Sequence, residues 1–249
     1  MIKRQIELTI NRLSFGTNHP SVNAHWKTHL LIKQQHDPDT IHMKRFAEAC
    51  DRNQAPILAV LKEVMPDRGK VLEIGSGTGQ HAAYFSHFLP NLTWQPSDLA
   101  DALPSIDAWR KESCVPNLNS PIVIDLLGNN EDLSRVDAIV CINVVHIVAW
   151  TGVERLFSIA ANILESKGVL YFYGPYRYPD RTLEPSNVAF DRWLKEHNPV
   201  SGIRDYAAVE SLAESSGFTL GGDRSMPSNN RSIWWVRQAP VQQLSLIHI

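Results

Sequence analysis

Short apolar runs alternate with amphipathic stretches through the middle of the chain. Apolar runs typical of strands fall at 70–74, 92–97, 121–127, 136–147 and 168–176. Between them, helical spacing of apolar residues is found at 56–65, 78–89, 102–112 and 152–164. Strands alternating with helices form right-handed crossovers around a parallel sheet. The pattern therefore predicts an α/β fold with helices on both faces of a mostly parallel sheet.

The region after residue 180 follows a different order. Helical patterns at 187–197 and 205–215 precede two strand-like runs, GFTL (217–220) and SIWWV (232–236). Two strands with little between them predict an antiparallel hairpin at the sheet edge, which gives seven strands in all. Trp234 and Trp235 would point to opposite faces of the last strand, and we expect a core role for them.

Both ends of the chain read differently from the region between them. Residues 1–42 hold five of the ten histidines and only short apolar runs, which predicts a poorly ordered extension. Residues 43–238 are expected to form one domain, followed by an irregular tail at 239–249.

Composition narrows the class of protein. A chain of 249 residues, 43% of them hydrophobic, is long enough for a sizeable core. The net charge of −2 gives no strong nucleic-acid signal. Three dispersed cysteines fit neither a disulfide framework nor a structural zinc site. The sequence contains no run of about 18 apolar residues, so we expect no membrane span. We expect a cytoplasmic protein.

Candidate chemistry begins at the stretch VLEIGSGTGQHAAYF (71–85), which places Gly75, Gly77 and Gly79 between the first strand and the next helix. Glycines at such a turn allow the backbone to approach a ligand closely. The dinucleotide pattern G-x-G-x-x-G requires a small residue where this chain has Gln80, and no Lys-Ser/Thr pair follows to make a phosphate loop. The turn therefore indicates a different nucleotide ligand.

Three acids at successive strand ends refine that ligand. Glu73 precedes the glycines, and it is either a surface charge or an anchor for the loop or for a ligand amino group. Asp98 lies about 20 residues further on, where an acid accepts hydrogen bonds from ribose hydroxyls, and Asp125 is placed to meet an adenine amino group. An adenosine with a cationic amino-acid end and no phosphate fits these acids, which predicts S-adenosylmethionine (SAM) as cofactor.

Several motifs together resemble the seven-stranded class I SAM-dependent methyltransferases. They are EIGSGTG (73–79), QPSD (95–98), VIDLLG (123–128) and INVVHI (142–147). With ACDRN (49–53) and YGPYR (173–177), the chain resembles more closely an uncharacterised methyltransferase-like family, domain of unknown function 938, over about residues 44–238.

The resemblance implies a sheet order of 3-2-1-4-5-7-6 with strand seven antiparallel. It implies that the glycines and Ser76 cradle the methionine part, that Asp98 binds the ribose, and that Asp125 lies beside the adenine. Asn143 would line the cofactor through its backbone. Arg52 and Asn53, expected just before the first helix, would cover the cofactor or form a substrate wall.

The acceptor side is less determined. His146 follows the fourth strand and is either a general base or substrate contact, or a packed structural histidine. Arg177 and Tyr176, beside Tyr173 and Tyr178, follow the fifth strand, where they could hold a carboxylate or stack on a flat acceptor; Tyr173 itself is expected in the core.

The function predicted is methyl transfer from SAM to an unidentified acceptor. A small molecule is favoured, because the chain lacks the [DN]PPY motif of nucleic-acid amino methylation and a set of carboxylates for a catalytic metal. Two alternatives stay open: a non-catalytic SAM-binding or interaction protein, and an NAD-dependent oxidoreductase, which Gln80 disfavours.

Overall fold

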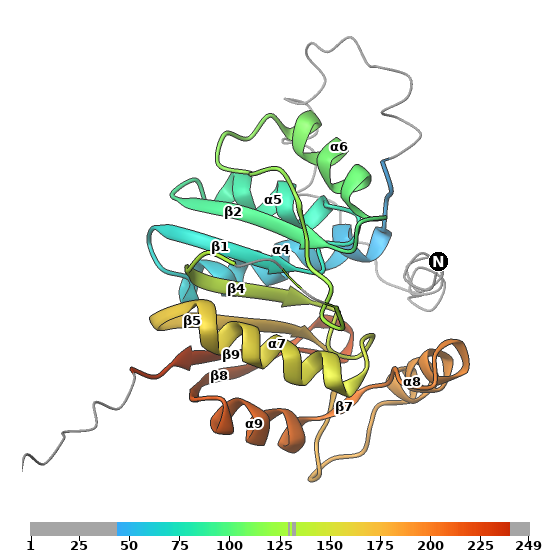
Figure 1. Cartoon of the computed structure of the whole chain (residues 1–249). Helices are drawn as coiled ribbons and strands as arrows, with labels where there is room; N and C mark the ends of the chain where they lie inside the picture. Colours follow the sequence, from blue (N-terminus) through green and yellow to red (C-terminus); the bar gives the residue numbers. More distant parts are fainter. Residues whose placement is uncertain (1–43, 129, 131–132, 240–249) are drawn as a thin grey trace, which may run out of the picture.

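The computed structural model describes residues 44–128, 130 and 133–239 (Figure 1). The extension expected at 1–42 lies outside the described residues, and so does the expected tail except for Ala239. The helices of the described part are α4 (Glu48–Val64), α5 (Gln80–Phe88), α6 (Leu103–Ser113), α7 (Trp150–Ile163), α8 (Pro185–His197) and α9 (Tyr206–Ser215).

The main sheet has seven strands in the order β3-β2-β1-β4-β5-β9-β8. The parallel strands are β3 (Ile122–Val123), β2 (Leu92–Asp98), β1 (Gly69–Ile74), β4 (Val136–Ile142) and β5 (Leu164–Gly174). The antiparallel hairpin of β8 (Phe218–Met226) and β9 (Asn230–Arg237) closes the sheet through β9, which pairs with β5. Both the predicted fold class and the predicted strand order are confirmed.

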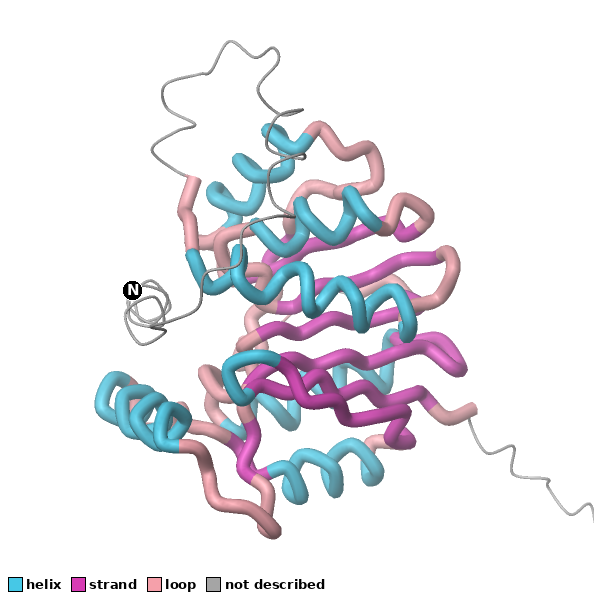
Figure 2. Tube along the Cα trace, turned by 180° about the vertical axis from the view of Figure 1, so that it is seen from behind, coloured by secondary structure: helices cyan, strands magenta, loops and turns pink. Residues whose placement is uncertain are grey.

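Helices cover both faces of this sheet. Figures 1 and 2 show α4 and α5 on one face and α7 and α9 on the other. Central strands buried on both faces are expected to be apolar along their whole length, as the strand AIVCI of β4 is: its alternate residues join two separate hydrophobic clusters. The hairpin contributes to both, since Trp235 packs in one cluster and Trp234 against the other.

Several predicted boundaries were wrong. The helix expected from residue 56 begins at Glu48, so Arg52, Asn53 and Pro56 lie inside α4 and not before it. The strand expected at 121–127 is limited to Ile122–Val123, because only two of its residues pair with β2. The strand expected at 136–147 ends at Ile142.

Pro104 lies within the helical pattern predicted at 102–112. It stands at the start of α6, where the missing N–H of proline costs no helical hydrogen bond.

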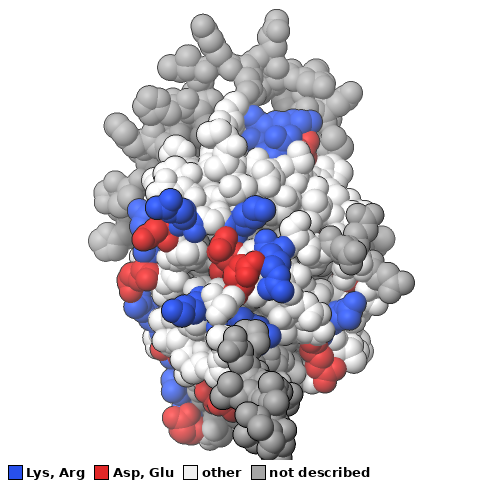
Figure 3. Space-filling view, turned by 60° about the vertical axis from the view of Figure 1, so that its left-hand side comes forward, with Lys and Arg blue, Asp and Glu red and all other residues white. Residues whose placement is uncertain are grey.

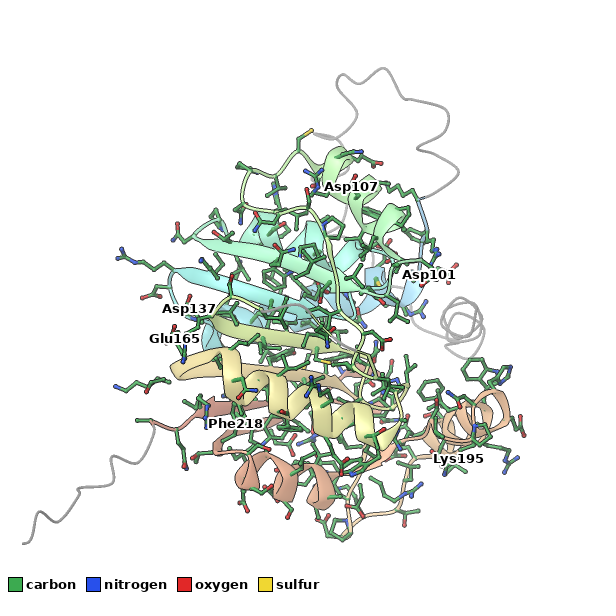
Figure 4. The ribbon with its side chains drawn as sticks, in the orientation of Figure 1. Asp101, Asp107, Asp137, Glu165, Lys195 and Phe218 are labelled. Carbon is green, nitrogen blue, oxygen red and sulfur yellow. The ribbon has the colours of Figure 1, made fainter. Side chains whose placement is uncertain are left out.

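One excursion leaves the sheet after β5. It consists of β6 (Tyr176–Arg177), helix α8 and β7 (Arg204–Asp205), with β6 and β7 paired in parallel as a small second sheet. Figure 4 marks its position through Lys195, which lies beyond the carboxyl ends of the parallel strands, whereas Asp137 and Glu165 mark the opposite edge. The excursion therefore lies at the edge where α/β proteins bind ligands.

Candidate cofactor site

The glycine turn after β1 has a backbone conformation that favours glycine. Gly75, Gly77 and Gly79 have φ angles of 73°, 63° and 97°, in the left-handed region that disfavours side chains. Gly79 has a second constraint, since a Cβ there would lie 2.7 Å from the Cα of Ile106 in α6. The sequence thus needs glycine here both to form the turn and to admit the neighbouring helix.

The end of β2 holds this turn in place. The N–H groups of Gly75 and Ser76 both donate to the carbonyl of Ser97 at 2.9 Å. The N–H of Gly77 donates to Oδ2 of Asp98 at 2.7 Å, and Oδ1 of Asp98 accepts from the N–H of Leu99 at 2.8 Å. The Asp98 side chain, 6% exposed, is therefore oriented by two backbone donors directly beside the glycine turn.

Glu73 is buried at the end of β1, with 1% of its surface exposed, so it is not a surface charge. Its Oε2 accepts a hydrogen bond of 2.9 Å from the indole N–H of Trp94 on β2. Its backbone carbonyl accepts from the hydroxyl of Ser97. A buried carboxyl group requires such partners, and Glu73 thereby places carboxyl oxygens next to the turn.

Asp125 lies in a turn just past β3 and is half-buried. Its Oδ1 accepts from the N–H of Leu127 at 2.9 Å, and Asn130 pairs with its backbone N–H and carbonyl. Leu99 and Leu127 follow the two acids with 48% and 63% of their surfaces exposed. Each acid is therefore accompanied by an exposed apolar side chain at the same edge of the sheet.

The start of α4 is anchored to the start of α5. Gln80 accepts from the N–H of Ala47 at 2.6 Å and donates to Asp51 at 3.2 Å. Nε2 of His81 lies 2.7 Å from Oδ1 of Asn53, and because this oxygen only accepts, Nε2 carries the proton. Arg52 is exposed and pairs with Glu48 at 3.4 Å. Asn53 thus reaches the first turn of α5, while Arg52 does not contact it.

Gln80 and His81 are functional candidates that the sequence reasoning missed. Gln80 had served only as evidence against a dinucleotide turn. Both are buried, and burial alone lowers the pKa of His81 to about 3. Two polar residues on the buried face of an otherwise apolar helix were the signal that could have identified them.

The loop after β4 brings Asn143 and His146 to the end of β5. Asn143 has a φ of 57° and its N–H donates to the carbonyl of Tyr173 at 2.8 Å. His146 is 2% exposed, lies edge-on to the ring of Phe190 from α8, and has no hydrogen-bond partner at Nε2 among the described residues. Burial, with Arg204 nearby, lowers its pKa to about 3. The ideal pKa of a general base lies near the working pH. The pKa of His146 in this arrangement lies far below neutral pH.

Tyr176 and Arg177 occupy different environments. Tyr176 is buried, and burial raises its pKa well above the usual value. Arg177 is largely exposed and pairs with Asp191 of α8 at 3.2 Å. Within the part of the chain that the structure describes, no hydrogen bond or ion pair joins either residue to His146, so the predicted acceptor residues do not converge as one unit.

Two kinds of feature are absent from the described residues. None of the described helices combines the length and apolar character needed to cross a membrane. No group of three or more histidine, cysteine or acidic side chains with metal-binding geometry was found among the same residues. On the side of the molecule in Figure 3, acidic and basic side chains are mixed, with no patch of a single sign.

The fold is that of the class I SAM-dependent methyltransferases. An O-methyltransferase family protein from Burkholderia thailandensis has a TM-score of 0.65 at 18% identity, over 78% of this chain and 58% of its own. Human N-acetylserotonin methyltransferase in complex with SAM has a TM-score of 0.65 at 16% identity, and the match covers 80% of this chain and 56% of its own. An O-methyltransferase family 2 protein from Planctomyces limnophilus, in complex with apigenin, has a TM-score of 0.65 at 12% identity, and the match covers 86% of this chain and 66% of its own. The chain thus spans less than two-thirds of these proteins.

The chain belongs to the DUF938 family, described as proteins of unknown function, whose model matches residues 44–237. This confirms the family resemblance seen in the sequence.

Proposed function

We propose that this protein transfers a methyl group from SAM to a small-molecule acceptor. The observation that carries the proposal is the glycine turn fixed against Asp98, with the buried Glu73 before it. The similarity in fold to O-methyltransferases, one of them holding SAM, supports it.

The residues at the edge of the sheet fit each part of SAM. A carboxylate offers about four acceptor positions, so ribose hydroxyls and the backbone N–H groups of Gly77 and Leu99 can share the carboxylate of Asp98. The exposed Leu99 and Leu127 offer apolar surface to the adenine ring, with Asp125 available to its amino group. Glu73 provides negative potential for the amino group of the methionine part.

The chemistry requires little from the protein beyond alignment. SAM supplies an electrophilic methyl carbon: a lone pair of the acceptor forms the new bond, the electrons of the broken carbon–sulfur bond stay on sulfur as a neutral thioether, and the acceptor proton passes to water. Because the pKa of His146 is about 3, which makes it a weak base, and because Phe190 covers it, we assign it a positioning role at the end of β5. Asn143 supports the same edge through its bond to Tyr173.

Calorimetry with SAM and with NAD tests the cofactor. We expect SAM to bind and NAD not to bind; the reverse would support an oxidoreductase. Gln80 argues for SAM, since its side chain fills the first turn of α5 and anchors Ala47, where a dinucleotide turn needs a small residue.

A second candidate function is SAM binding without catalysis, which the buried His146 and the separated acceptor residues favour. Incubation with methyl-labelled SAM and a metabolite extract separates the two. Labelled product in any fraction supports the enzyme, whereas SAM binding with no labelled product supports the binding protein.

A further inference from the structure

A polar cavity of about 170 Å³ opens between β6, the start of α8 and the β8–β9 hairpin. Its wall combines Tyr176, Tyr178, Arg181, Asn187, Asn230 and Arg231. None of these positions belongs to the glycine turn or to the acids around it. Since liquid water takes about 30 Å³ per molecule, the cavity has room for a small organic group.

Asn230 links this cavity to the cofactor site. Burial raises the pKa of the Tyr173 hydroxyl, at the end of β5, to about 12, and the nearby side chains of Asn53 and Asn230 oppose that rise. Asn53 in turn bonds to His81 in the first turn of α5, directly after the glycine turn. The cavity and the turn are therefore joined through a short series of polar side chains at one edge of the sheet.

Two guanidinium groups determine the chemistry of the cavity. Their central carbons lie 4.3 Å (Arg181) and 5.4 Å (Arg231) from the ring centre of Tyr178. Asp223 balances the charge of Arg231, since it accepts from Nε at 2.7 Å. It also accepts from the hydroxyl of Tyr178 at 2.6 Å, which fixes the ring against which both guanidinium groups lie.

Arg181 has no such compensation. Its one ion pair among the described residues is a 3.5 Å contact with its neighbour Asp180, and 53% of its side chain is exposed. The guanidinium lies over the Tyr178 ring and lines the cavity, and a guanidinium is the side-chain group whose paired N–H donors match a carboxylate. Glu184 precedes the first residue of α8 and lines the same cavity, and its side chain does not cap the start of the helix. Its negative charge opposes a second anionic group, which favours a ligand with one carboxylate.

We propose that this cavity is the acceptor site and that it binds a small monocarboxylic acid through Arg181. The proposal rests on the proposed methyltransferase function. It assigns recognition of the acceptor to Arg181, and it leaves Arg231 as a structural cation paired with Asp223.

The test uses the whole protein, methyl-labelled SAM, and a metabolite extract separated beforehand into a fraction retained on an anion exchanger and a flow-through fraction. We expect label to enter products from the retained fraction only. In Arg181→Gln, the amount of that fraction needed for half-maximal rate should rise about 10- to 100-fold, the effect of losing a hydrogen bond to a charged group. The maximal rate and the SAM affinity by calorimetry should stay within about twofold, because only ground-state binding is removed.

Arg68→Gln is the matched control. Arg68 is exposed and directly precedes β1. The second residue of that strand, Lys70, bonds through its N–H to Asp137, which Figure 4 marks at the opposite end of the strands. The same change in charge there should leave every quantity unaltered.

The outcomes separate this inference from the function beneath it. Label from the flow-through fraction alone, or equal half-maximal amounts for the two variants, overturns the carboxylate assignment and leaves the methyltransferase standing. SAM binding without any labelled product overturns both. A reduced SAM affinity in Arg181→Gln would place Arg181 at the cofactor and also overturn the acceptor assignment.

Discussion

Replacing Asp98 by asparagine tests the cofactor site most directly. In the protein, Asp98 accepts from the N–H groups of Gly77 and Leu99 at 2.7 and 2.8 Å. Asparagine keeps one acceptor oxygen and turns an NH₂ group toward the other N–H, so one buried donor loses its partner. We expect this to lower the free energy of unfolding by about 1–3 kcal/mol, measured by urea denaturation.

The effect on SAM should be larger than the effect on stability. Two ribose hydroxyls bonded to an ionised carboxylate contribute about 1.5–3 kcal/mol each. Their loss should weaken SAM binding about 10²- to 10⁴-fold by calorimetry. Asp101→Asn, the same change at an exposed position three residues on, is the control and should bind SAM as the wild type does.

A comparison of two ligands separates ribose binding from support of the turn. Adenosine carries the ribose hydroxyls, and 2′,3′-dideoxyadenosine lacks them. The wild-type protein should prefer adenosine, and Asp98→Asn should lose most of that preference. If both proteins show the same preference, Asp98 only holds the turn and the ribose assignment is wrong.

Three further predictions concern the surroundings of the site. Gly79→Ala should lower the free energy of unfolding by more than about 2 kcal/mol, because its φ is 97° and the new Cβ would meet the backbone of Ile106; Gly152→Ala, inside α7, where the new Cβ would meet only side chains at 3.3 Å or more, should show a smaller loss in the same denaturation experiment. Tyr173→Phe should lower it by about 1 kcal/mol, because the side chains of Asn53 and Asn230 lose a neighbouring hydroxyl in a largely buried place; unchanged stability would show that this hydroxyl bonds to neither. His81 and His146 have a pKa of about 3 when folded, against about 6.5 unfolded, so the unfolded state binds more protons between these values. The free energy of unfolding is therefore highest above pH 6.5 and falls as the pH is lowered toward 3. The loss at pH 5 is about 2 kcal/mol for each histidine. Equal stability at pH 8 and pH 5 would show that the two histidines are not buried as neutral groups.

The sheet was predictable because its signal is local. Each parallel strand is a short apolar run, and each crossover helix has its own period, so strand order followed from the fold that the motifs indicated. Boundaries failed where the local signal continued past the structure. The apolar run of β4 extends to Ile147 in the sequence, yet pairing ends at Ile142, since Asn143 takes a positive φ and starts the loop.

The cofactor site was predicted better than the acceptor side for the same reason. Glycines and acids that end successive strands come together in any parallel sheet, so their spacing carries the information. The cavity instead needs Arg181 and Asn187 to meet Asn230 and Arg231, more than 40 residues further along the chain. No local pattern in either segment indicates a contact with the other. Arg177, the cation favoured from the sequence, is paired with Asp191 instead.

The proposed donor and acceptor sides of the site depend on different parts of the chain, and this difference affects how acceptor specificity can change. The proposed donor side depends on backbone geometry: positive φ angles, N–H groups and one oriented carboxylate. The proposed acceptor side depends on side chains of the β6–α8–β7 excursion and the β8–β9 hairpin. The excursion is fastened to the loop after β4 mainly through backbone carbonyls, which accept from Arg204, Ser201 and Gly202. Because carbonyls are present whatever the side chains are, residues such as Arg181 can change without loosening this attachment. Substitutions on the cavity wall should therefore alter the acceptor that is bound while leaving the affinity for SAM intact.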